Sequence, residues 1–323
     1  MWGILRAEGE KMRLNEIGEH NLIKRITRKA KNRNVLVGIG DDAAVIKTGK
    51  GKMVITVDTL VENDHFTLKW FTPKQVGMKA MEINTSDIGA MNAIPRYALV
   101  SLCLPKTTTL NFVDGLYKGI YSVADKYGID IVGGNMTHGH EIVVDITMIG
   151  EAKGKIPLRS NARPGDYIIS SGNLGASTAG LNLFLKKKSG FAAVKKKHVE
   201  PKAKLKKAYA LAKYTNAMED CSDGLASEVR NICAQSKCGA VIEWDKIPVS
   251  RETIKAAKAI GLESKNFALF GGEDFELIAT VPKKHLSKVK GFVVGRITKE
   301  KKIYLKKNGK KEQLEKAGYD HFA

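Results

Sequence analysis

The chain has 323 residues, enough for two domains of ordinary size, and its 43% apolar and 27% charged residues fit a globular protein with a substantial core. No apolar run is long enough to span a bilayer, and residues 1–11 lack the apolar segment of a secretory signal, whether translation starts at Met1 or at Met12. The net charge is +20, and most of the excess lies in the lysine-rich second half, where a solvated surface and a nucleic-acid patch both remain open.

The four cysteines favour a reducing compartment. They stand at positions 103, 221, 233 and 238, with no CxxC pair and no zinc-site spacing. In a chain of this length we interpret them as small buried apolar side chains. A cytoplasmic location is therefore our expectation.

The first half of the chain is predicted to combine strands with helices. Apolar periodicity predicts helices at 14–30, 73–92 and 111–127. The stretch IVGGNMTHG, residues 131–139, suggests a strand, a tight glycine turn and then polar groups. β-Branched runs bounded by turn residues predict strands at 35–39, 43–47, 52–60, 97–104 and 142–150.

The second half begins after a polar turn at 159–166 that contains proline and glycine. This turn leads us to assign residues 1–150 and 151–323 to two α/β domains, so that the fold class is α+β. Strands are predicted at 167–171, 239–244, 275–281, 291–297 and 302–305. Helices are predicted at 176–185, 200–213, 224–236 and 251–260.

Asp87 stands where the pattern calls for an apolar residue. In the helix predicted at 73–92, the apolar stripe passes from Ala80 and Ile83 through position 87 to Ala90. A carboxylate on a core-facing stripe is costly unless a partner compensates its charge. A buried salt bridge or a cap to a neighbouring turn would explain Asp87, and so would a metal ion.

Four further aspartates favour the metal ion. Asp42 follows a strand end, Asp58 stands late in its strand, and Asp220 and Asp223 precede a predicted helix. A single Asp-Gly pair is only a turn signal, but several such places in a basic protein suggest a cluster. Mg²⁺ binds through a few carboxylates together with substrate phosphates, so the set predicts nucleotide chemistry.

The common phosphate-binding loops do not occur in the sequence. There is no GxxxxGK[ST] motif and no HRD or DFG element of protein kinases. The GNLG turn at 172–175, between a strand and a helix, could present backbone N–H groups to a phosphate. A simple connecting turn also explains it.

Eight motifs occur in order along residues 38–322: GIGDDAAVI, TVDTLVENDHF, NTSDIGAMNAIPRYA, IVGGNMTHG, RSNARPGD, DCSDGLASEV, FGGEDFELIATV and GYDHF. Together they resemble thiamine-monophosphate kinase, of the superfamily that includes aminoimidazole ribonucleotide synthetase. The GDD, SDG and GGED elements are partly shared across that superfamily, whereas VDTLVENDHF with GYDHF favours the thiamine enzyme.

The resemblance implies a fold and a reaction. The N-terminal domain would join that of a second subunit in a β-barrel across a homodimer, and the C-terminal α/β domain would complete the active-site cleft. ATP and several Mg²⁺ ions would bind between the domains. The γ-phosphoryl group would pass directly to thiamine monophosphate and give thiamine diphosphate.

The resemblance also implies the roles of individual residues. Three aspartates would be catalytic: Asp42, Asp87 and Asp223. The metal ligands would be Asp42, Thr56, Val57, Asp58, Asp87, Asn135, Asp220 and Asp223, of which Val57 can offer only its main-chain carbonyl. The ATP contacts would be Gly134, Asn135, Arg159 and Ser222. The substrate contacts would be His65, Glu273 and Tyr319.

Two positions depart from the family pattern. Asn135 stands where the family usually has aspartate, and Ala176 stands where it usually has an acidic residue. Asn135 keeps an oxygen ligand but loses a negative charge, so we expect weaker binding of one Mg²⁺ ion.

Two other functions stay open at this stage. One is a related ATP-dependent enzyme with a different phosphate or acyl substrate. The other is a catalytically weakened protein whose lysine-rich half binds nucleic acid or another polyanion. Turnover that depends on thiamine monophosphate would separate both from the kinase.

Overall fold

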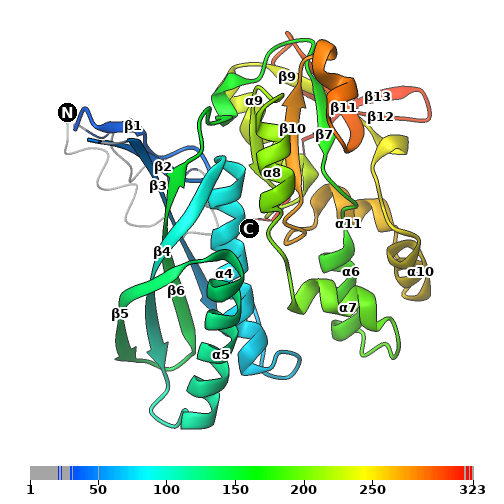
Figure 1. Ribbon diagram of the computed structural model, residues 1–323. Coiled ribbons are helices and arrows are strands. Elements are labelled where there is room, and N and C mark those ends of the chain that lie inside the picture. Colours follow the sequence, from blue (N-terminus) through cyan, green and yellow to red (C-terminus); the bar gives the residue numbers. More distant parts are fainter. Residues whose placement is uncertain are drawn as a thin grey trace, which may run out of the picture.

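Two α/β domains lie side by side in the computed structural model (Figure 1), which describes residues 21, 23, 30, 32–49, 51–315, 318, 319 and 321. The helix predicted at 14–30 therefore falls almost entirely outside the described residues. Among the described residues, no helix is both long enough and apolar enough to cross a membrane.

The first domain is built on a sheet with the strand order β1-β2-β3-β6-β4-β5. Neighbouring strands run antiparallel except for β4 and β5, which run parallel. The strands are β1 (Val35–Val37), β2 (Ala44–Thr48), β3 (Gly51–Val61), β4 (Ala93–Leu104), β5 (Asp130–His138) and β6 (Val143–Ala152).

Helices α4 (Pro73–Ala90) and α5 (Leu110–Tyr127) cover one face of this sheet and share its apolar core (Figure 1). α4 begins as its sequence predicts, because Thr72 caps it in a reciprocal capping box with Gln75 and Pro73 takes the first helical position. α5 ends at Gly128, whose φ of 67° is the left-handed conformation that glycine adopts at no steric cost.

The second domain contains a mixed sheet with the order β13-β12-β9-β11-β7-β10-β8. Its strands are β7 (Tyr167–Ser170), β8 (Met218–Asp220), β9 (Gly239–Glu243), β10 (Leu277–Val281), β11 (Phe292–Thr298), β12 (Ile303–Lys307) and β13 (Lys310–Gln313). Its helices are α6 (Ala176–Leu185), α7 (Ala192–Val199), α8 (Leu205–Ala212), α9 (Leu225–Ser236), α10 (Arg251–Ala259) and α11 (Ser264–Phe270). Short 3-10 turns are η1 (Arg159–Asn161), η2 (Trp244–Lys246) and η3 (Lys283–Lys288).

The end of α4 joins the two domains. Ala90 packs in a shared apolar cluster with Ala208 and Leu211 of α8 and with Met218 of β8. Since Asp87 lies in the last turn of α4, this packing brings it to the start of the second sheet.

Two sequence predictions were wrong in detail. The helix predicted at 200–213 begins only at Leu205, and residues 201–204, which include Pro201, form no helix. The separate helix α7 ends just before them, at Val199. The glycine turn predicted within 131–139 is instead part of the continuous strand β5. A Cβ on Gly134 would lie 1.9 Å from the carbonyl oxygen of Val100, so glycine here permits close approach to β4 rather than a turn.

Candidate active site

Three aspartates from distant parts of the chain meet where the two domains join. Asp42 follows β1, Asp87 lies in the last turn of α4, and Asp220 ends β8. Their carboxylate oxygens lie within 4.8 Å of one another. Thr56 of β3 contacts this group, because its hydroxyl donates a hydrogen bond to Asp87 Oδ2 over 2.7 Å.

The electrostatics of this cluster call for a cation. Burial raises the pKa of Asp87 well above its usual range, and the charges of Asp58, Asp220 and Asp42 raise it further. Burial and the charge of Asp223 likewise raise the pKa of Asp58 to about 6. Asp42 Oδ2 and Asp220 Oδ2 are buried, and among the described residues no donor meets either oxygen at full hydrogen-bonding geometry. Clustered carboxylate oxygens with so few donors are the ligands that Mg²⁺ takes, so the residues present fit the ion.

Arg159 closes one side of the cluster. It belongs to η1, and its guanidinium pairs with Asp42 and, over 2.7 Å, with the fully buried Glu219. Its backbone N–H donates to Asp41 over 3.1 Å. Two carboxylates therefore already hold the Arg159 side chain in place, in the position from which it is predicted to contact a phosphate.

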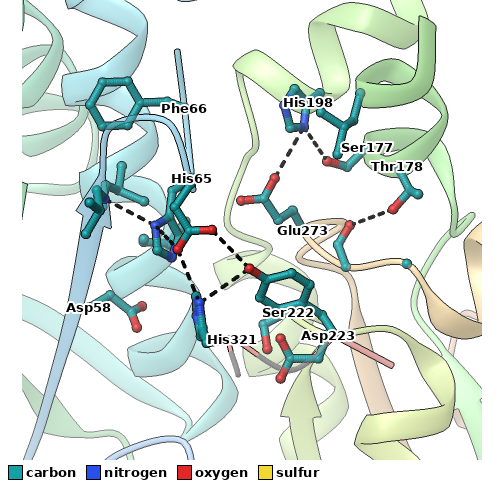
Figure 2. Close-up of a pocket in the computed structure, with 18 of the residues that line it drawn as sticks. Asp58, His65, Phe66, Ser177, Thr178, His198, Ser222, Asp223, Glu273 and His321 are labelled. Atoms are coloured by element: carbon teal, nitrogen blue, oxygen red, sulfur yellow. Dashed lines mark hydrogen bonds and ion pairs between the residues drawn. The ribbon is translucent and has the colours of Figure 1, made fainter. Parts of the chain in front are cut away.

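A cavity of about 1150 Å³ adjoins the cluster and separates the two domains. Asp58, His65 and Phe66 face it from the first domain, and Ser177, Thr178, His198 and Glu273 face it from the second (Figure 2). Ser222, Asp223, Tyr319 and Val57 also line it, so half of the predicted site residues share this space. An apolar part of its lining includes Trp70, Leu181 and Leu185.

Two described residues near the C-terminus, Tyr319 and His321, line this cavity. Gly318 N–H donates to Ser227 Oγ over 2.8 Å, and Tyr319 Oη donates to Asp64 Oδ1 over 3.1 Å. His321 Nδ1 lies 3.3 Å from Asp64 Oδ2, and its ring is 5.0 Å from that of His65 (Figure 2). Asp64 thus ties the C-terminal segment to the loop after β3.

Glu273 presents a carboxylate to the cavity from a left-handed backbone with φ of 64°. Burial alone would raise its pKa, but Lys79 and His198 outweigh burial and lower the pKa to about 2. Its Oε2 lies 3.3 Å from His198 Nδ1, and the same ring nitrogen lies 3.2 Å from Ser177 Oγ. The carboxylate is therefore ionised across the physiological pH range.

The GNLG turn is a capped connection between strand and helix. The carboxylate of Asp274 accepts the N–H groups of Gly175, Ala176 and Ser177 over 2.5, 3.0 and 3.1 Å. These are the donors at the start of α6 that a phosphate would need. The connecting-turn interpretation is the one that this structure supports.

Gly134 and Asn135 lie apart from the carboxylate cluster. Asn135 stands on the edge strand β5, in register with Ser101 of β4, and through it with Asp145 of β6 and Thr59 of β3. Three strand spacings of roughly 4.8 Å separate it from β3. This row of residues lies on the sheet face away from α4 and α5, so a single chain does not bring Asn135 to Asp58.

Several residues of the site escaped the sequence analysis. Lys79, His198 and Asp64 contact predicted substrate residues, and Glu228 accepts the backbone N–H of Asp223 over 2.8 Å. A lysine on the buried stripe of α4 was a usable signal. The other contacts join residues so far apart in sequence that no local pattern marks them.

Comparisons with known proteins give a family. Residues 40–152 match the N-terminal domain of AIR synthase related proteins, and residues 163–308 match the C-terminal domain. Thiamine-monophosphate kinase of Buchnera aphidicola (subspecies Schizaphis graminum) is 37% identical and covers 95% of this chain and 99% of its own. Thiamine-monophosphate kinase of Aquifex aeolicus is 33% identical, and the match covers 96% of this chain and 100% of the relative.

Solved structures agree. AaThiL complexed with AMPPCP and TMP superposes with a TM-score of 0.88 at 33% identity, over 96% of this chain and 99% of its own. A second structure, of thiamine monophosphate kinase from Aquifex aeolicus, gives 0.80 at 32% identity over 93% and 99%. Hydrogenase maturation protein HypE, at 17% identity and a TM-score of 0.68, shares the fold alone. On its matched domains and near-full-length relatives, the chain belongs to the thiamine-monophosphate kinase family.

Proposed function

We propose that this protein transfers the γ-phosphoryl group of ATP to thiamine monophosphate and forms thiamine diphosphate. One observation carries the proposal: Asp58 and Asp223 connect a cation-binding carboxylate cluster to a cavity large enough for an organic phosphate. The family supports the substrates, because the similar AaThiL structure holds the ATP analogue AMPPCP together with TMP.

The two ends of the cavity would bind different parts of the substrates, the phosphates at one end and the thiamine rings at the other. Mg²⁺ held by Asp42, Asp87 and Asp220, with Asp58 and Asp223 beside them, would neutralise the phosphates of both substrates. The apolar wall around Trp70, Leu181 and Leu185 suits the rings of thiamine, and the ionised Glu273 can accept a hydrogen bond from its aminopyrimidine. Substrates bound between the domains would displace water from the cavity, which would favour transfer to the substrate over hydrolysis.

The direct test uses the complete protein with ATP, Mg²⁺ and thiamine monophosphate. We expect thiamine diphosphate and ADP in equal amounts, separated by chromatography. ADP release with another phosphate or acyl acceptor, but none with thiamine monophosphate, would instead support the related-enzyme alternative. Salt-sensitive binding of nucleic acid without any ATP turnover would support the polyanion-binding alternative.

We also propose that the protein acts as a cytoplasmic homodimer. The side of the first sheet that α4 and α5 leave uncovered exposes Val57, Tyr97 and Leu99 by 55%, 43% and 37%, and β5 is an edge strand. Apolar sheet surface and an unpaired edge favour pairing with a second copy. Asn135 and Gly134 would then lie at the interface, where they could reach the nucleotide of the opposite subunit.

The oligomeric state can be tested with one matched pair of variants. Leu99→Glu places a charge on the uncovered sheet face, whereas Leu110→Glu alters a leucine that is 82% exposed at the start of α5. Sedimentation should show a dimer for the wild type and Leu110→Glu, and a monomer for Leu99→Glu. A dimer for all three proteins would rule out this face.

A further inference from the structure

A fully buried lysine lies beneath the cavity. Lys79 stands on α4, and its side chain has 0% exposure to solvent. Burying an ammonium group costs desolvation free energy unless several partners accept hydrogen bonds from it or pair with its charge. The partners are the carbonyl oxygen of His65, at 2.8 Å, and Glu273 Oε1, with which it forms an ion pair. The ammonium also lies 5.4 Å from the centre of the Phe71 ring.

The two polar partners of Lys79 belong to opposite walls of the cavity. His65 stands in the loop after β3, in the first domain, while Glu273 stands between α11 and β10, in the second. Both residues line the cavity (Figure 2). Lys79 is not among the residues of its lining. One ammonium group therefore contacts both walls from behind.

Glu273 depends on such support for its place. Its left-handed backbone is unfavourable for a residue with a side chain, and persists only where surrounding contacts fix it. Its N–H donates to the carbonyl oxygen of Ser222 over 2.7 Å, and its Oε2 faces His198. Lys79 holds the remaining oxygen, Oε1, so that both carboxylate oxygens are engaged and the group is oriented.

We propose that Lys79 is a positioning residue, which sets the Glu273 carboxylate and the His65 loop at a fixed separation for the heteroaromatic cation of the substrate. The proposal rests on the proposed function for the identity of that substrate. It explains why a lysine occupies a buried stripe of α4, where an apolar residue would avoid the cost of desolvation.

The kinetic test compares Lys79→Met with a matched control on the same helix. Glu82→Gln serves as the control because Glu82 is 2% exposed and pairs with Lys126 over 2.7 Å, away from the cavity. In Lys79→Met we expect the KM for thiamine monophosphate to rise at least tenfold and the KM for ATP to change less than twofold. In the Glu273→Gln background, Lys79→Met should raise that KM by a smaller factor than in the wild type, because only the contact with the His65 loop is left to lose. A Lys79→Met protein whose two KM values match those of Glu82→Gln would overturn the proposal.

A second readout needs no catalysis. Hydrogen exchange followed by mass spectrometry should show faster exchange in segments 62–69 and 270–276 of Lys79→Met than of the wild type, and no such change in Glu82→Gln. If Lys79→Met does not fold, the double variant Lys79→Met with Glu273→Gln takes its place, because it does not leave the Glu273 carboxylate without its lysine partner. Segment 62–69 of the double variant should exchange faster than that of Glu273→Gln alone. Unchanged exchange in these segments would contradict the role of Lys79, whereas a wild type without thiamine diphosphate formation would contradict only the proposed function.

Discussion

The carboxylates of the cluster repel one another electrostatically unless a cation lies between them, and this repulsion determines what single substitutions do. Asp220 is buried, and Asp42 and Asp87 are mostly withdrawn from solvent; like-charged neighbours surround all three, and desolvation is the largest cause of the raised pKa of each. Such an arrangement lowers the stability of the metal-free protein in exchange for an organised binding site.

Replacing Asp87 with asparagine should separate function from folding. We expect thiamine diphosphate formation to fall by on the order of 10²–10³-fold, the scale seen when an electrostatic group of an active site is lost. Without Mg²⁺, the variant should melt at or above the wild-type temperature because one buried like charge is gone. Asp223→Asn should lose activity similarly, and near-normal rates in both variants would refute the cluster as the catalytic centre.

Asn135 offers a test in the opposite direction. In the proposed homodimer Asn135 would reach the nucleotide of the opposite subunit. Asn135→Asp adds the charge that the family resemblance implies there, so the Mg²⁺ concentration for half-maximal activity should fall severalfold. Thr137→Asp is the control because Thr137 lies two residues along the same strand and on the same face of the sheet. An unchanged Mg²⁺ dependence, or an equal change in the control, would mean that Asn135 has no part in metal binding.

At the scale of secondary structure, α4 and α5 are held together by glycine. A Cβ on Gly119 would lie 2.0 Å from the carbonyl oxygen of Lys74, and one on Gly77 would lie 2.1 Å from that of Leu116. The two helices therefore pack backbone to backbone, and this close contact fixes α4, which carries both Lys79 and Asp87.

This contact reverses the usual effect of replacing a helical glycine. In a free helix, Gly→Ala would stabilise by roughly 0.5–1 kcal/mol. Gly119→Ala forces the helices apart, and overpacking costs about 1–3 kcal/mol, so the melting temperature should fall by several degrees. Gly49→Ala is the control because no atom lies within 4 Å of its Cβ position, and it should melt like the wild type. A Gly119→Ala protein as stable as Gly49→Ala would show that the helices can shift without cost.

For the whole molecule, the cluster predicts how pH and Mg²⁺ act together on stability. The folded-state pKa is about 6 for Asp58 and about 7 for Asp41, both raised first by burial from 3.8. Between pH 4 and 7 the folded protein therefore holds more protons than the unfolded chain, so the contribution of these groups to metal-free stability falls as pH rises.

Mg²⁺ requires the ionised carboxylates, so it should stabilise the protein more at pH 8 than at pH 5.5. We expect the increase in melting temperature between chelator and saturating Mg²⁺ to be several degrees at pH 8 and much smaller at pH 5.5. Asp87→Asn should lose most of the increase at pH 8. Equal increases at the two pH values would indicate binding away from these carboxylates.

Sequence alone located most helices and strands, for local physical reasons. Thr72 and Pro73 mark the start of α4, and the apolar periodicity of residues 176–185 gives α6 its observed bounds. Asp87 could be singled out because a carboxylate on an apolar stripe needs compensation, and the other aspartates because they recur at strand ends and helix starts. Each of these signals lies within a few residues of the feature it predicts.

The tertiary structure decided whatever depends on distant contacts. Tyr319 meets Asp64 across 255 positions of sequence, and Lys79 meets Glu273 only because two domains close on one cavity. β5 continues through its glycines because β4 lies beside it, and this places Asn135 on a sheet edge rather than at the cluster. Local propensity and residue spacing in the sequence determined the helices, the strands and the chemical types of the candidate site residues. Packing between the domains determined which of these residues come into contact, because the fold, and not the neighbouring sequence, sets the partners of a side chain.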